Sequence, residues 1–132
     1  MRIPHASWCM AQTVIRRYRE NIRLLTEWEM EVLDAKLMAK DPTAHKAMLL
    51  QSSYAQRLQR EITAVEDMMD RLSDEEQKVI RMRFWSSRAV VPYEYMLACN
   101  YSTRQMQRIV CTAIKIVAVN LGELNPKRWT IK

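Results

Sequence analysis

Glycine is almost absent from this chain: one residue of 132 is glycine, and four are proline. Tight β-hairpin turns need positive φ angles, which glycine adopts most readily, so hairpin-rich sandwiches and barrels are disfavoured. The scarcity also removes phosphate-binding loops, which need two or three glycines at fixed spacing. Because the apolar residues recur at steps of three and four, we expect an all-α protein.

Histidine and cysteine are scarce too. His5 and His45 stand far apart in the sequence and form no recognisable metal site. Cys9, Cys99 and Cys111 are odd in number and lack C-x-x-C spacing, so we expect reduced thiols that act as small apolar residues. No nucleophile has an evident base beside it. We therefore expect a protein that is not an enzyme and that uses no metal or cofactor.

Long apolar runs are missing. No stretch approaches the roughly 18 residues of a membrane span, and the N-terminus has no signal-peptide core. We therefore expect a cytoplasmic protein with no membrane partner.

Charge is distributed unevenly along the chain. Lys and Arg number 21 and Asp and Glu 15, a net charge of +6. Residues 1–71 hold 11 basic and 10 acidic residues, a net of +1, whereas residues 72–132 hold 10 and 5, a net of +5. A basic surplus of this kind favours a polyanionic partner for the C-terminal half.

The N-terminal half has the pattern of two long helices. The spacing predicts one helix from Trp8 to about Met38, ended by Asp41-Pro42, and a second from there to Leu72. Joined by a short turn, they should form an antiparallel αα-hairpin, and we take residues 1–71 as one domain. The hairpin is also where we expect a homodimer contact. Its predicted apolar stripes are Trp8, Ala11, Ile15, Tyr18, Ile22, Leu25 and Val32, then Leu50, Tyr54, Leu58, Ile62, Val65, Met69 and Leu72.

The C-terminal half, residues 72–132, has the pattern of three shorter helices and a tail. Ser73 and Glu76 form a capping box that starts a helix ending near Trp85. Pro92 opens a second helix, and Asn100 makes a turn. Ser102 caps the last helix, from Thr103 to Leu121, which ends at the single glycine, Gly122. A tight turn before the last of three helices is typical of a helix-turn-helix domain.

The last helix has two chemically distinct faces. At about 100° per residue, the core face holds Met106, Ile109, Val110, Ala113 and Val117. The opposite face holds Arg104, Gln107, Arg108, Cys111, Thr112 and Lys115, and no carboxylate occurs from Tyr95 to Leu121.

This outward face suits double-stranded DNA. Arg can donate two hydrogen bonds to guanine, and Gln can exchange two with adenine. Thr112 and Lys115, farther from the helix start, are better placed for phosphates. The candidate DNA-binding residues are Ser102, Thr103, Arg104, Gln105, Gln107, Arg108, Thr112, Lys115 and, before this helix, Arg88.

Two segments resemble region 4 of bacterial sigma factors. They are Leu72-Ser-Asp-Glu-Glu-Gln-Lys-Val-Ile-Arg-Met-Arg-Phe-Trp85 and Tyr101-Ser-Thr-Arg-Gln-Met-Gln-Arg-Ile-Val-Cys-Thr-Ala-Ile114. With its long helical N-terminal half, the whole chain resembles the phage RinA/ArpU family of late-gene transcription regulators. That resemblance implies a phage or prophage activator that binds promoter DNA, with host RNA polymerase as a further partner. It assigns base reading to Thr103, Arg104, Gln107 and Arg108. The chain departs from the usual pattern at Pro92, Met96 and Asn100.

Two other functions fit the same pattern. A small terminase-like DNA-packaging subunit also combines a helix-turn-helix domain with helical oligomerisation elements, and it would form a ring of many subunits. A helical adaptor that binds RNA polymerase without touching DNA is the other. The mass in solution distinguishes the packaging subunit from a regulator. Salt-dependent DNA binding distinguishes the polymerase adaptor from a regulator, because counterion release makes DNA affinity fall with salt.

Overall fold

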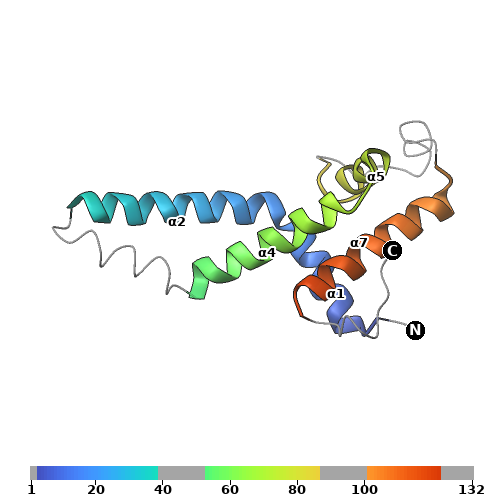
Figure 1. The fold of residues 1–132 in the computed structure, drawn as a ribbon, viewed down its shortest axis with the longest axis horizontal. Helices are drawn as coiled ribbons and strands as arrows, with labels where there is room; N and C mark the ends of the chain where they lie inside the picture. Colours follow the sequence, from blue (N-terminus) through green and yellow to red (C-terminus); the bar gives the residue numbers. More distant parts are fainter. Residues whose placement is uncertain (1–2, 39–52, 87–100, 123–132) are drawn as a thin grey trace. The chain divides into compact units, whose positions relative to one another are not determined.

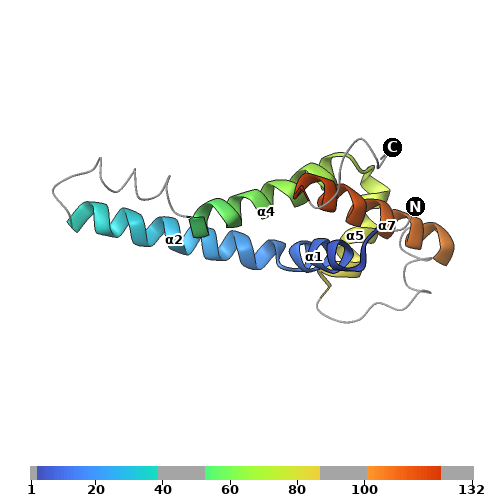
Figure 2. The same ribbon diagram turned by 90° about the horizontal axis from the view of Figure 1, so that it is seen from below.

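A computed structural model describes residues 3–38, 53–86 and 101–122 of the chain. The fold class is all-α, as predicted, and every element in the described ranges is an α-helix. Figures 1 and 2 show these helices in two views. They are α1 (His5–Arg16), α2 (Tyr18–Met38), α4 (Ser53–Asp70), α5 (Asp74–Phe84) and α7 (Thr103–Asn120). The turn of the expected hairpin and the middle helix of the expected helix-turn-helix lie outside the described residues, so that arrangement stays a prediction.

The chain divides into two compact units. Unit 1 comprises Met1–Arg16 and Ala64–Lys132, and unit 2 comprises Arg17–Thr63. This division differs from the boundary at residue 71 that the sequence suggested. The reason is that α1 packs against α7, so the first helix of the chain belongs with the last.

The helix expected from Trp8 to Met38 is interrupted at Arg17, between α1 and α2. Neither proline nor glycine stands there. Instead, the indole Nε1 of Trp85 donates a hydrogen bond of 2.8 Å to the carbonyl oxygen of Ile15, in the last turn of α1. A backbone hydrogen bond of 2.7 Å from Asn21 to Arg17 belongs to the first turn of α2. The break thus lies beside a tertiary contact rather than at a helix-breaking residue.

The core of unit 1 is built around α7. Both α1 and α5 pack against it. Helix α1 contributes Ala11, Val14 and Ile15 to the buried residues, and α5 contributes Val79 and Ile80. The buried residues of α7 are Met106, Ile109, Ala113, Ile114, Ile116, Val117 and Ala118.

The ends of α5 and α7 confirm the predicted caps. The Ser73 Oγ accepts a 3.2 Å hydrogen bond from the Glu76 amide, and the Ser73 amide donates one of 3.0 Å to Glu76 Oε1. Helix α7 ends at Asn120, and Gly122, two residues later, has a φ of 78° in the left-handed region that glycine tolerates best. Because capping depends on local sequence, these ends could be predicted without knowledge of the tertiary structure.

A polar network joins the end of α7 to the end of α4 within unit 1. Asn120 Nδ2 donates hydrogen bonds to the Ala64 carbonyl at 3.1 Å and to Asp67 Oδ2 at 2.8 Å. Asp67 also pairs with Arg71, the residue that directly follows α4, at 3.0 Å. The amide of Gln77, on α5, donates a 2.8 Å hydrogen bond to the Met69 carbonyl. These bonds fix three helices in one unit.

Unit 2 contains α2 and the first turns of α4. Leu58 and Ile62 are buried, as predicted, but Tyr54 is exposed. On α2 the predicted stripe residue Ile22 is exposed, and Asn21 is buried in its place, with 3% of its surface accessible. The less exposed residues of α2 lie on one side of the helix, at about 100° per residue, and Ile22 lies off that side; they are Asn21, Leu24, Leu25, Trp28 and Val32.

Candidate nucleic-acid interface

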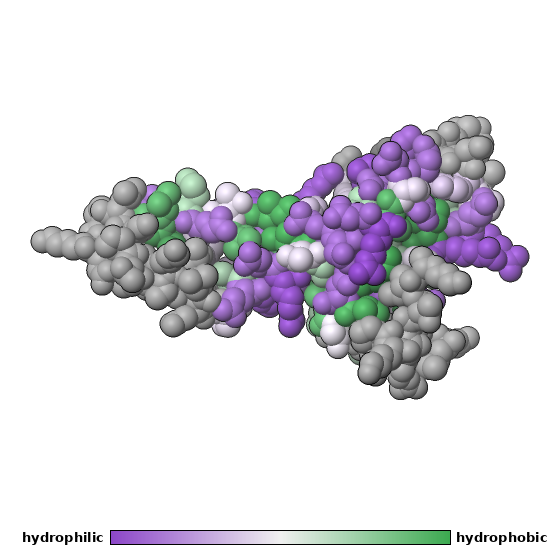
Figure 3. Space-filling model, viewed as in Figure 1, coloured by the Kyte–Doolittle hydropathy of each residue, from purple (hydrophilic) through white to green (hydrophobic). Residues whose placement is uncertain are grey.

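The first turns of α7 are accessible to a ligand on nearly every side. Thr103, Arg104, Gln107 and Arg108 are all exposed, and only Met106 is buried among residues 102–108. In Figure 3 the visible surface at the N-terminal end of α7 is hydrophilic. The four side chains that the sigma-like resemblance assigns to base reading are therefore all on the surface.

Ser102 and Gln105, also predicted as DNA-binding residues, are bonded to each other's backbone. The Ser102 Oγ accepts a hydrogen bond of 3.2 Å from the Gln105 amide, and Gln105 Oε1 accepts one of 2.8 Å from the Ser102 amide. Both side chains are exposed, yet their oxygens hold the first turn of the helix. We therefore assign them a capping role, in which they hold the turn that carries Arg104 and Gln107.

Thr112 and Lys115 are half-buried, although the sequence placed both on the outward face of the helix. Their neighbours Ala113, Ile114 and Ile116 are all buried. The outward face predicted for the whole helix is thus narrower in its second half. A lysine in this position can still extend its ammonium group to water along an apolar stem.

Arg88 lies outside the described residues, as do Pro92, Met96, Cys99 and Asn100. Their predicted roles are untested by the structure.

The exposed cations of α7 differ from those of α5 in their surroundings. Arg81 donates a hydrogen bond of 3.1 Å to Gln77 Oε1, and Arg83 lies over the ring of Phe84, 5.1 Å from its centre. By contrast, neither Arg104 nor Arg108 forms an ion pair with a described residue. Their guanidinium groups are the better candidates for contact with an external anion.

Gln107 and Arg108 lie three and four residues after Arg104, on the same side of α7. At 1.5 Å per residue, Arg104 and Arg108 are about 6 Å apart along the axis and about 40° apart around it. Residues 101–122 include no carboxylate, so no acidic group of α7 itself would repel a phosphate. The N-terminus of a helix also carries a partial positive charge. The arrangement can thus hold a nucleic-acid strand or base edge without rearrangement of the helix.

The part played by α1 in supporting α7 was missed at the sequence level. Ala11, Val14 and Ile15 were recognised as apolar, but periodicity does not identify the partner of a stripe. Trp85 marked the end of α5, yet nothing local revealed that its indole binds the Ile15 carbonyl. A lone tryptophan next to polar residues at a helix end was the only signal.

Among the described residues, no group of three or more His, Cys, Asp or Glu side chains lies close enough to hold a metal ion. None of the described helices combines the length and the apolar character needed to cross a bilayer. Cys9 and Cys111, the two described cysteines, are free thiols.

Comparison of the chain with family models, with curated proteins and with solved structures finds no match.

Proposed function

We propose that the protein is a sequence-specific DNA-binding transcriptional regulator that reads the major groove with the first turns of α7. The observation that carries the proposal is the contrast within α7. Its first turns expose Arg104, Gln107 and Arg108, whereas five of its seven buried residues lie in its second half. A recognition helix needs this combination, because the reading end must reach base edges while the other end is held by the domain.

The chemistry of the exposed end supports base reading over purely electrostatic contact. Arginine binds guanine through two hydrogen bonds, and glutamine binds adenine in the same way. Two arginines and a glutamine within five residues therefore offer more than charge. The resemblance to sigma-factor region 4 and to RinA/ArpU regulators supports the same role, activation of late phage genes, with host RNA polymerase as a second partner.

The first experiment is footprinting of the full-length protein on the DNA that surrounds its own gene, to obtain a specific duplex. Arg104→Ala should then weaken binding to that duplex by about 1–3 kcal/mol and relax the preference at one base pair. Lys115→Ala should weaken specific and scrambled duplexes about equally and reduce the salt slope by roughly one unit. Both variants should fold, since neither side chain is buried.

Both variants are compared at one salt concentration, with specific and scrambled duplexes side by side. Equal weakening on both duplexes by Arg104→Ala would contradict base reading and leave an electrostatic contact. If the wild-type protein shows no salt-dependent binding to any duplex, DNA is not its partner and the polymerase adaptor becomes the better explanation. A ring of many subunits in solution would instead favour the packaging subunit.

A further inference from the structure

We infer that the outward side of α2 is a self-association surface on which a second copy of this chain lies antiparallel. Three large aliphatic side chains of this helix are exposed: Ile22 by 39%, Met30 by 57% and Leu33 by 50%. In Figure 3 hydrophobic surface interrupts the hydrophilic surface along α2.

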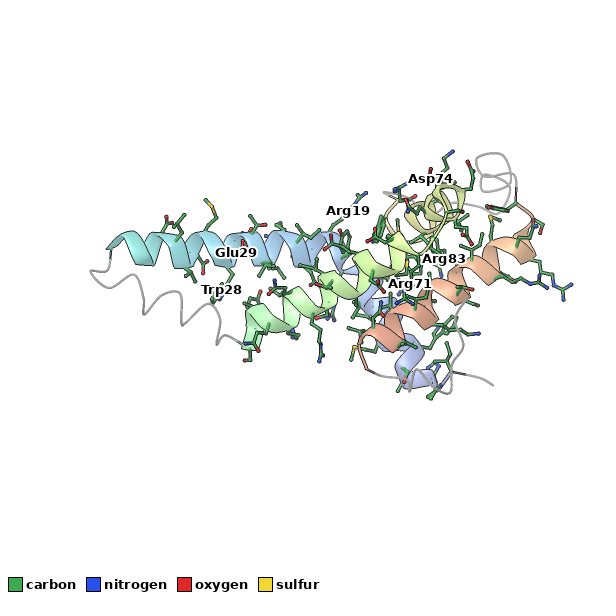
Figure 4. All side chains as sticks on the ribbon, viewed as in Figure 1. Arg19, Trp28, Glu29, Arg71, Asp74 and Arg83 are labelled. Carbon is green, nitrogen blue, oxygen red and sulfur yellow. The ribbon has the colours of Figure 1, made fainter. Side chains whose placement is uncertain are left out.

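These three residues form one ridge. At about 100° per residue they fall within an arc of about 80°, and they extend about 16 Å along the axis. Thr26 and Arg19 share this arc. Trp28, which is half-buried, lies on the opposite side, and Figure 4 shows Arg19 and Trp28 pointing to opposite sides of α2. The ridge is therefore distinct from the side of α2 that the fold covers.

Charge along α2 identifies the occupant of the ridge. Residues 17–23 contain three arginines and one glutamate, whereas residues 27–34 contain four carboxylates and no cation. All of these charged side chains are exposed; they are Arg17, Arg19, Glu20 and Arg23, then Glu27, Glu29, Glu31 and Asp34. An antiparallel copy places the basic segment of one α2 beside the acidic segment of the other. A parallel copy would place like charges side by side, which is unfavourable.

The apolar residues have the same symmetry. A two-fold axis near residue 28 brings Ile22 opposite Leu33 of the partner and Thr26 opposite Met30 of the partner. It also brings Arg23 near Asp34 of the partner. A surface that complements itself in shape and in charge about one point has the property of an isologous dimer interface. The second copy is therefore the occupant that both observations favour.

Sedimentation equilibrium of the full-length chain tests the surface. We expect a dimer at tens of micromolar. Met30→Asp should raise the dimer dissociation constant at least about 10-fold, because it places a charge in the apolar centre and adds to the acidic segment. The matched control is Met10→Asp on α1, where Met10 is exposed by 48% and lies off the ridge. A monomeric wild type, or an equal response to both substitutions, would overturn the inference.

Cross-linking tests the orientation. In a chain whose three cysteines are replaced by serine and whose helicity is confirmed by circular dichroism, Ile22→Cys and Leu33→Cys are made separately. A short bismaleimide should join the two variants when mixed. It should not join Ile22→Cys chains to each other, because an antiparallel pair holds those positions about 18 Å apart along the axis. Cross-linking of each variant with itself would show a parallel dimer and overturn the antiparallel arrangement.

Neither experiment contains DNA, so this inference can fail without affecting the DNA-binding proposal. Conversely, Arg104→Ala should leave the dimer intact, because Arg104 lies on α7 in unit 1.

Discussion

Trp85 and Asn120 of unit 1 form hydrogen bonds that reach far along the sequence, whereas the ion pairs of unit 2 lie within single helices. In unit 1, Trp85 binds a carbonyl 70 residues away, and Asn120 binds groups 53 and 56 residues away. In unit 2, Arg23 pairs with Glu20 and Glu27, and Arg57 with Glu61, three or four positions along the same helix. Unit 1 is thus fixed by its tertiary structure, whereas the ion pairs of unit 2 stabilise single helices.

The two units also differ in the burial of their polar and apolar side chains. Asn21 of unit 2 is buried, and its Nδ2 has no hydrogen-bond partner among the described residues. Four large apolar residues of unit 2, Ile22, Met30, Leu33 and Tyr54, are exposed, compared with Met10 in unit 1. A unit with several exposed apolar side chains gains most from a partner that covers them.

From the contrast between the units we expect the largest loss of stability on substitution of Ile114, which is fully buried in α7. Ile114→Ala should lower the free energy of unfolding by about 2–5 kcal/mol, because it removes buried methyl groups and leaves a cavity. Urea unfolding followed by circular dichroism measures the change. Arg108→Ala on the exposed end of the same helix is the control, and it should stay within about 0.5 kcal/mol of wild type. A similar loss in both would mean that α7 is not anchored through its second half.

The second largest loss of stability is expected on removal of the hydrogen bond between α1 and the end of α5. Trp85→Phe keeps an aromatic ring but removes the donor to the Ile15 carbonyl, which should cost about 1–3 kcal/mol. Amide hydrogen exchange should increase in α1 as well as near residue 85, because the two segments are joined by this bond. Trp28→Phe on α2 serves as control. If exchange in α1 does not change, the bond is not what holds that helix.

A smaller effect is expected at the cap of α7. Ser102→Ala removes the acceptor for the Gln105 amide and should cost about 0.5–2 kcal/mol. DNA affinity should fall as well, because Arg104 and Gln107 lie in the turns that the capping box orders. Thr103→Ala, beside the cap, is the comparison for stability. If Ser102→Ala binds DNA with the affinity of the wild type, the cap does not position Arg104 and Gln107 for DNA binding.

The smallest effect is predicted at Glu20 in unit 2. Hydrogen bonds from Arg23 lower the pKa of the Glu20 carboxyl below its ordinary value. The stabilisation is therefore fully present above the ordinary carboxyl pKa and is lost as the pH falls through the lowered value. An NMR titration of Glu20 should show the depressed midpoint, and Arg23→Gln should raise it. The pair is exposed, so Glu20→Gln should change the melting temperature less than Ile114→Ala, Trp85→Phe or Ser102→Ala. A larger change would contradict the contrast between the units.

Local sequence predicted the features that local chemistry determines. These features follow from residue type and helical period. They are the all-α class, the Ser73 and Ser102 caps, the end of α7 just before Gly122, and the exposure of Arg104, Gln107 and Arg108. Each depends on neighbours within a few positions in the sequence.

What could not be predicted depends on partners far away in the sequence. The interruption at Arg17, the association of α1 with α7 and the partial burial of Lys115 arise from tertiary packing. Periodicity reports that a face is apolar but not what covers it, so α1 and α2 were read as one continuous helix and Ile22 as a core residue. The DNA-binding role and the helix-turn-helix arrangement remain predictions.

The packing of α1 on α7 has a consequence for synthesis of the protein on the ribosome. Helix α1 is made first, but the helix that covers Ala11, Val14 and Ile15 is completed about 100 residues later. At elongation rates of about 5–20 residues per second, that delay is roughly 5–20 s. Unit 1 can therefore close only after α7 has been synthesised, and until then the apolar side of α1 has no helix to cover it.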